Sequence, residues 1–149
     1  ILRTSWVYAA RGGNFAKTML RLAQERERLT VIDDQWGAPT GAELIADVSA
    51  HAIAQTRQQP GKAGIYHLAP AGETTWFQYV KHVIAQAQQA QSAIKIKATE
   101  ILPIPTSAYP TPARRPHNSR LDTRKLQAAF GLSLPPWQRG VDRMLVEIL

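Results

Sequence analysis

The segment 109–122 (YPTPARRPHNSRLD) carries the residues of this chain that are best suited to binding an anion. Its prolines favour an extended backbone, and two consecutive arginines are followed by Asn118 and Ser119. Guanidinium groups bind phosphate oxygens through paired hydrogen bonds, and a helix expected just after the segment adds the positive end of its dipole. We therefore expect Arg115, Asn118 and Ser119 to contact a diphosphate. The alternative is a structural arm whose arginines face solvent.

The formal net charge of +7 also favours an anionic ligand, because basic proteins tend to have anionic partners. Five cations fall in or just after the same segment: Arg114, Arg115, Arg120, Arg124 and Lys125. Nucleic-acid-binding surfaces usually interleave such charges with aromatic residues or place them along one helix. Here they surround proline-rich loop sequence, which favours a compact anion pocket. Net charge is the only feature that supports a small nucleic-acid-binding domain. We therefore expect no nucleic-acid partner.

The sequence shows no complete catalytic set. No glycine-rich dinucleotide fingerprint follows a predicted strand, no tyrosine is followed four residues later by lysine, and neither a serine nucleophile elbow nor a phosphate-binding loop is present. The chain has no cysteine, and its four histidines lack metal-ligand spacing. No apolar run is long enough for a membrane span. We therefore predict no catalytic residue, no zinc site, no membrane partner and a cytoplasmic location.

Hydrophobic periodicity predicts alternating strands and helices, which is typical of an α/β fold. Asn14 and Thr75 are expected to cap helices, and Gly131 is expected to end one. The predicted helices are 14–28, 42–57, one that begins after Thr75, 122–130 and one that begins after Pro135-Pro136; the predicted strands are 1–8, 29–33, 65–69 and 93–104.

Aromatic and polar residues lie where strands of such a fold end. Trp6 and Tyr8 close the first predicted strand, and open α/β sheets bind ligands at the carboxyl ends of their strands. An aromatic ring there can contact a sugar or a base, although spacing alone slightly favours core packing for Trp6. The segment 34–40 (DQWGAPT) is expected to be a shaped loop, and Gln35 lies within it.

Several motifs, in order, resemble one family. RTSWVY, GGNFAKTML, VIDDQWGAPT, GIYHLA, TTWFQYV, YPTPARRPHNSRLD and FGLSLPPW together are similar to the C-terminal half of dTDP-4-dehydrorhamnose reductases, which are extended short-chain dehydrogenase/reductases. The resemblance implies reduction of dTDP-4-dehydro-L-rhamnose with NADPH or NADH. It also implies that the cofactor and the catalytic Thr, Tyr and Lys belong to a Rossmann half that this chain lacks. We expect 1–149 to be one substrate-binding domain, inactive alone, with 1–13 completing the parent sheet.

The resemblance assigns roles to five residues in the first third of the chain. Trp6 matches a tryptophan that lines the sugar pocket, and Thr4 and Ser5 lie on the strand end that borders the nicotinamide. Asn14 matches an asparagine near the nucleotide diphosphate, although residue type alone favours a helix cap. Gln35 is expected to contact the nucleotide or to shape its loop.

The remaining assignments concern the diphosphate and a metal. Arg115 matches the arginine that reaches the diphosphate, beside Asn118 and Ser119. In some members of the family, glutamates bind Mg²⁺ at a dimer contact, and the resemblance makes Glu43 and Glu147 their candidate counterparts. The resemblance thus implies a homodimer as well as a dTDP-sugar ligand. Relatives of this fold also serve as regulatory subunits of methionine adenosyltransferase, which is the alternative function.

Overall fold

The computed structural model is an elongated α/β molecule that describes residues 1–149 except 91–93, 110–112 and 114. The α/β class predicted from periodicity is confirmed. Its helices are α1 (Phe15–Glu25), α2 (Ala42–Gln58), α3 (Trp76–Gln89), α4 (Arg124–Phe130) and α5 (Trp137–Ile148), with two short 3₁₀ turns at Pro60–Lys62 and Thr106–Ala108.

The strands of the described residues form four two-stranded ladders. Three ladders are parallel and one is antiparallel, and every pair joins segments far apart in the sequence. The parallel pairs are β1 (Leu2–Arg3) with β6 (Tyr66–His67), β2 (Val7–Tyr8) with β5 (Thr40–Gly41), and β3 (Arg28–Ile32) with β8 (Glu100–Ile104); β4 (Trp36–Gly37) pairs antiparallel with β7 (Thr74–Thr75).

Side chains predicted to cap helices do so. The Asn14 carboxamide oxygen accepts a hydrogen bond from the backbone N–H of Lys17, and the Thr75 hydroxyl accepts one from that of Gln78. Each bond satisfies a backbone donor that has no partner within the first helical turn. Gly131 follows α4 with a φ of +64°, the left-handed conformation that glycine adopts without steric cost.

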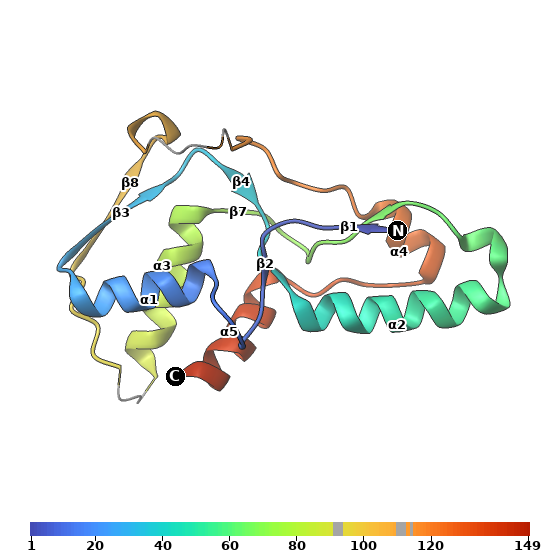
Figure 1. The fold of residues 1–149 in the computed structure, drawn as a ribbon, viewed down its shortest axis with the longest axis horizontal. Coiled ribbons are helices and arrows are strands. Elements are labelled where there is room, and N and C mark those ends of the chain that lie inside the picture. The colour runs from blue at the N-terminus through green and yellow to red at the C-terminus, as the bar shows by residue number, and fades with distance from the viewer. Residues whose placement is uncertain (91–93, 110–112, 114) are drawn as a thin grey trace.

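The larger part of the core lies where α1, α3 and α5 meet against β3, at the left of Figure 1. These helices pack their apolar faces on one another, and side chains such as Leu20, Val80 and Val141 are buried. His82 on α3 also contacts Asp142 on α5 at 2.6 Å (Nε2 to Oδ1). Packing in this larger core therefore holds α1 and β3 in place.

A second, smaller core joins α2, α4 and β6 at the right of Figure 1. Its buried members are Val48, Tyr66, Leu68, Leu126 and Phe130. Among the apolar residues of α2, Val48 is buried, and Leu44, Ile45 and Ala52 are half-buried. Only one side of α2 packs against the rest of the chain, because this helix extends away from the larger core.

The first eight residues do not form the single buried strand that their composition predicts. β1 and β2 are separated by 4–6, and Ile1 and Val7 are 80% and 53% exposed. Trp6 interrupts the strand with a φ of +52°, a conformation that costs a side chain of this size about 1–3 kcal/mol. Surrounding contacts must therefore hold Trp6 in place.

Smaller differences concern element ends. The first helix ends at Glu25, since Arg28 already pairs in β3, and the loop 34–41 contains the short strands β4 and β5. Thr123 occupies the N-cap position of α4, while Asp122 accepts a hydrogen bond from the backbone N–H of Arg124. Among the described residues, no helix combines the length and the apolar composition needed to cross a membrane.

Candidate functional site

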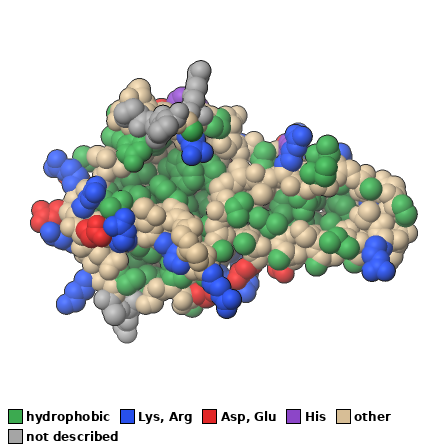
Figure 2. All heavy atoms as spheres, in the orientation of Figure 1, with side chains coloured by type: hydrophobic (Ala, Val, Ile, Leu, Met, Phe, Trp, Pro, Cys, Tyr) green, Lys and Arg blue, Asp and Glu red, His purple; other side chains and the backbone are tan. Residues whose placement is uncertain are grey.

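A groove of about 780 Å³ opens beside α1 and β3 and contains several of the residues singled out in the sequence. Figure 2 shows hydrophobic side chains gathered over this half of the molecule, with lysines and arginines around them. Four predicted site residues line the groove: Trp6, Gln35, Arg115 and Ser119. They are joined by aromatic and basic side chains to which the sequence assigned no site role: Phe15, Trp76, Tyr109, Arg26 and Arg28.

Two tryptophans form one wall of the groove. The indoles of Trp6 and Trp76 stack with their ring centroids 3.6 Å apart and their planes at 15°, and the ring of Phe15 lies 4.4 Å from that of Trp76. Gly37 lies so close to Trp6 that a β-carbon at this position would come within 2.6 Å of the indole. Trp6 is therefore held between Trp76 and the backbone of β4.

Backbone contacts fix the segment that carries Trp6. The carbonyl of Trp6 accepts a hydrogen bond from the N–H of Thr40 at 3.1 Å, and the Ser5 hydroxyl donates to the carbonyl of Ser119 at 3.2 Å. The second bond brings a residue predicted to border the nicotinamide next to one predicted to bind the diphosphate. Thr4, the other residue predicted on the cofactor side, is exposed.

Three arginines give the groove a basic margin. Arg26 and Arg28 lie at the junction of α1 and β3, and Arg115 comes from the proline-rich segment on the other side. Arg28 Nε also contacts a carboxylate oxygen of Glu100 at 2.5 Å. Arg26 and Arg28 lie some 90 residues away from Arg115 in the chain, so the clustering of arginines in the sequence did not indicate them. Arg114 falls outside the described residues.

The segment 117–119 is held against β4 like an additional short strand. The N–H of Trp36 donates to the carbonyl of His117, and the N–H of Ser119 donates to the carbonyl of Trp36, both at 2.8 Å. The Asn118 carboxamide oxygen accepts hydrogen bonds from the backbone N–H and the guanidinium of Arg120. Asn118 thus shapes the turn after Ser119, and it is not among the side chains that line the groove.

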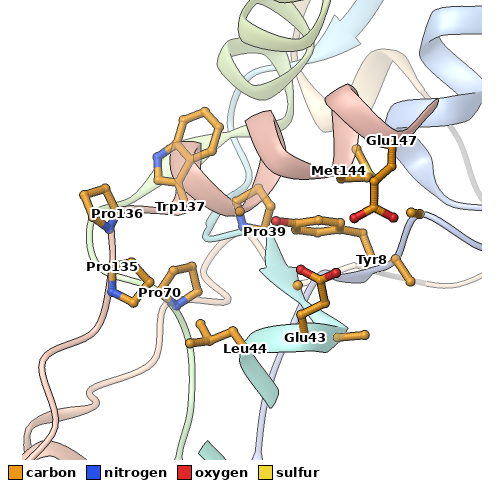
Figure 3. Close-up of a pocket in the computed structure, with 15 residues that line it drawn as sticks. Tyr8, Pro39, Glu43, Leu44, Pro70, Pro135, Pro136, Trp137, Met144 and Glu147 are labelled. Carbon is orange, nitrogen blue, oxygen red and sulfur yellow. The ribbon is translucent and has the colours of Figure 1, made fainter. Parts of the chain in front are cut away.

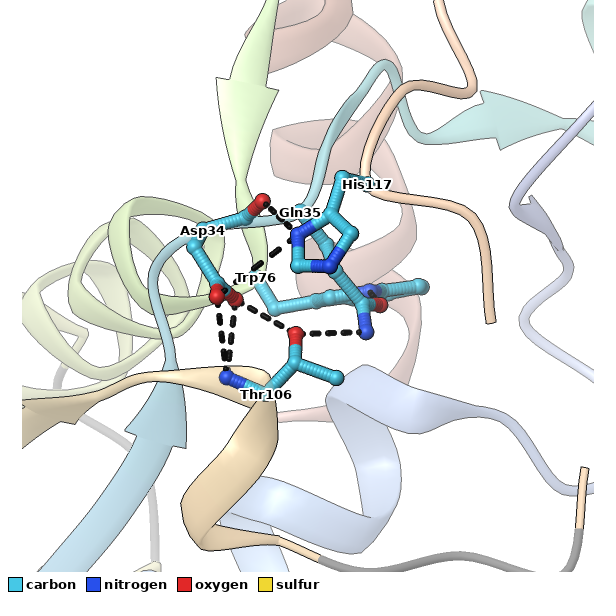
Figure 4. Close-up of polar contacts among 5 residues, drawn as sticks. All are labelled: Asp34, Gln35, Trp76, Thr106 and His117. Carbon is cyan, nitrogen blue, oxygen red and sulfur yellow. Dashed lines mark hydrogen bonds and ion pairs between the residues drawn. The ribbon is translucent and has the colours of Figure 1, made fainter. Parts of the chain in front are cut away.

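A polar network lies behind the aromatic wall (Figure 4). The Gln35 amide donates to the Thr106 hydroxyl at 3.0 Å and accepts from the Trp76 indole N–H at 3.1 Å. The backbone N–H and the hydroxyl of Thr106 in turn donate to the Asp34 carboxylate, and His117 Nδ1 lies 3.6 Å from one of its oxygens. The network connects β3, β8, α3 and the basic segment.

The same contacts set the ionisation of Asp34. Partial desolvation of the carboxyl acts to raise its pKa, but the hydrogen bonds from Thr106 and the nearby His117 outweigh that effect. The pKa of Asp34 therefore lies below its ordinary value of 3.8, and the carboxylate is charged near neutral pH.

Asn14 caps α1 and also contacts the loop before the helix. Its amide donates to the carbonyl of Ala9 at 2.7 Å while its oxygen caps α1, and it is not among the residues that line the groove. The helix-cap interpretation is confirmed. A contact with the nucleotide stays a prediction.

Glu43 and Glu147 line a small pocket of about 50 Å³, in which both carboxylates point toward Tyr8 (Figure 3). Burial raises the pKa of the Tyr8 phenol well above its ordinary value of 10.0, and the charges of Glu43 and Asp142 add to this effect. Glu43 also contacts Arg143 at 3.2 Å. Within the described ranges, no group of three or more His, Cys, Asp and Glu side chains could hold a metal ion. A Mg²⁺ site here would need further ligands from a partner or from water.

Comparison with known proteins identifies the family. The sequence matches the RmlD substrate binding domain over residues 1–149. The chain belongs to this family. It is 59% identical over 148 residues to dTDP-4-dehydrorhamnose reductase of Escherichia coli K12, which covers 99% of this chain and 49% of that protein. The reductase of Burkholderia thailandensis is 44% identical, covering 99% of this chain and 51% of that protein. The chain thus spans about half the length of the curated relatives it matches.

Solved structures agree with this assignment. The dTDP-4-dehydrorhamnose reductase of Bacillus anthracis, in complex with NADP, is 32% identical and superimposes with a TM-score of 0.78 over 98% of this chain and 47% of that one. The orthologue from Clostridium acetobutylicum is 26% identical, with a TM-score of 0.84 over 97% of this chain and 47% of that one. The family resemblance and the fold inferred from the sequence motifs are therefore confirmed.

Proposed function

We propose that the groove beside α1 and β3 binds the dTDP-sugar substrate of a dTDP-4-dehydrorhamnose reductase. The observation that carries this proposal is the combination of a stacked aromatic wall, Trp6 on Trp76, with the basic margin of Arg26, Arg28 and Arg115 in one groove. Aromatic rings suit the faces of a sugar or a base, and guanidinium groups suit a diphosphate. A nucleoside diphosphate sugar contains both kinds of group.

In this proposal each predicted residue has a defined part. Arg115 binds the diphosphate, and Ser119 and Asn118 hold the neighbouring backbone and supply hydrogen-bonding groups. Trp6 contacts the sugar, Gln35 supports that wall, and Asn14 organises the loop before α1. Thr4 and Ser5 border the nicotinamide of the cofactor, as the family resemblance implies, and the Ser5 hydroxyl also contacts the carbonyl of Ser119.

The reaction proposed for the whole enzyme is hydride transfer from NADPH or NADH to the 4-keto group of dTDP-4-dehydro-L-rhamnose. The cofactor is held mainly outside these 149 residues, which alone are expected to bind substrate without turning it over. We further propose a cytoplasmic homodimer, with Glu43 and Glu147 near a Mg²⁺ ion at its contact. The role of a methionine adenosyltransferase regulatory subunit stays an alternative that no contact described above favours.

Calorimetric titration with dTDP tests the binding proposal. The chain should give a saturable heat, and Arg115→Ala should weaken binding about tenfold to a hundredfold, because hydrogen bonds to charged groups contribute about 1.5–3 kcal/mol. Arg21→Ala is the matched control, since Arg21 pairs with Glu25 on the exposed surface of α1, outside the groove. Equal affinities for the wild type and Arg115→Ala would contradict the proposal.

A further inference from the structure

Gln35 is buried, and both the nitrogen and the oxygen of its side-chain amide form hydrogen bonds. Only 4% of the residue is exposed. The Thr106 hydroxyl donates its proton to Asp34, so toward Gln35 it can only accept, and the Gln35 nitrogen must face it. The Gln35 oxygen is thereby directed at the Trp76 indole N–H. The orientation of the amide is fixed by its partners.

This bond acts on the ring that supports Trp6. Trp76 begins α3, and its indole is held on one edge by the Gln35 oxygen and on one face by Trp6. Without the Gln35 oxygen the indole N–H would lose its acceptor, and the ring could turn about its side-chain bonds. Trp6 would then lose the surface on which it stacks. Trp6 adopts a left-handed backbone conformation and therefore depends on such contacts to stay in place.

We propose that Gln35 is a positioning residue that fixes Trp76 against Trp6 and thereby sets the wall on which the sugar part of the substrate rests. The proposal deepens the function proposed above and rests on it for the identity of the ligand. In this proposal Gln35 acts on the position of the aromatic wall, whereas Arg115 binds the diphosphate. The two residues should therefore affect different parts of the ligand.

The first test needs no ligand. The chain has four tryptophans, so its indole N–H signals in a ¹⁵N–¹H spectrum can be assigned by replacing each with phenylalanine. Gln35→Met, which keeps the length of the side chain but offers only a weak acceptor, should speed hydrogen exchange of the Trp76 indole about tenfold. It should also shift the Trp6 signal, because ring currents act across the stack, and leave that of Trp137 unchanged. An unchanged Trp6 signal would overturn the proposal.

A conservative variant separates positioning from general destabilisation. In its protonated form Gln35→Glu keeps an acceptor oxygen for the Trp76 indole and an O–H donor for Thr106. Measured at a pH where the new carboxyl is protonated, it should retain the Trp6 and Trp76 signals of the wild type more closely than Gln35→Met does. Should Gln35→Met fail to fold, Gln35→Asn replaces it, because its shorter side chain cannot reach both Thr106 and Trp76. Identical signals in the glutamate variant and in the methionine or asparagine variant would overturn the proposal.

The second test uses two probes that differ only in the sugar. Gln35→Met should weaken dTDP-rhamnose binding about tenfold, the equivalent of an aromatic contact of about 1.4 kcal/mol, and change dTDP binding less than twofold. Arg115→Ala should weaken both. Equal losses for the two probes in Gln35→Met would overturn the positioning role. Absence of binding by the wild-type chain would instead contradict the proposed function, while the indole signals would still decide the role of Gln35.

Discussion

The indoles of Trp6 and Trp76 stack with their centroids 3.6 Å apart, and this contact joins the segment between β1 and β2 to the start of α3. One partner belongs to a strained turn and the other to the first residue of a capped helix. The wall of the groove is thus anchored on the Trp76 side to the larger core, because buried residues of α3 belong to that core. A site built on such an element holds its geometry better than one built on loops alone.

Gly37→Ala should disrupt this wall. The new methyl group would meet the Trp6 ring at 2.6 Å, and the ring cannot retreat because Trp76 lies against it. Forced overpacking of this kind costs about 1–3 kcal/mol of unfolding free energy. Denaturant unfolding measures the loss, and the indole signals of Trp6 and Trp76 should shift together.

Gly61→Ala is the control for that substitution. A β-carbon at Gly61 meets no atom within 4 Å, so the expected change is within about 0.5 kcal/mol. Equal stabilities of the two variants would show that Trp6 has room to move, contrary to the packing described here.

Asn14→Ala should lower the unfolding free energy by about 1 kcal/mol, because it removes the cap of α1. The same substitution frees the loop before the helix, since the Asn14 amide also bonds to the carbonyl of Ala9. Asn14→Asp keeps the cap acceptor and loses only the amide donor, so it should be the more stable of the two variants in thermal unfolding. Both variants lose the bond to Ala9, so the reverse order would contradict the capping role given to the Asn14 oxygen.

Acid should weaken the contacts of the Asp34 carboxylate with Thr106 and His117. The pKa of Asp34 is lower in the folded chain than its ordinary value of 3.8, so its contacts stabilise the fold fully above that value and are lost as the pH falls through the folded pKa. Carboxyl ¹³C titration measures this directly. Thr106→Val removes the hydroxyl donor and should raise the pKa of Asp34 toward 3.8; an unchanged pKa would contradict the role given to Thr106.

Local sequence signals were sufficient to locate the helices, although not the last residue of α1 or the cap of α4. Asn14 and Thr75 were recognisable as caps because their partners lie three residues away, and Gly131 because a helix end favours a left-handed residue. The family motifs, which cover the whole chain, supplied the function class and candidate residues that composition and periodicity alone could not.

The arrangement of the groove depends on contacts that local patterns do not contain. Gln35 bonds to residues 41 and 71 positions away, so its buried role could not be inferred from the DQWGAPT loop. The positive φ of Trp6 likewise follows from contacts with Trp76 and Gly37, and strand propensity therefore predicted the wrong backbone for residues 1–8.

The most direct test of the substrate site is the location of bound dTDP in a crystal structure of the chain. The described residues also form a second groove of about 440 Å³, which lies between α2 and β6 and is lined by Arg57, Lys62 and Tyr66. We predict that the diphosphate lies within hydrogen-bonding distance of Arg115, in the groove walled by Trp6 and Trp76. A diphosphate bound at Arg57 and Lys62 instead would contradict this account.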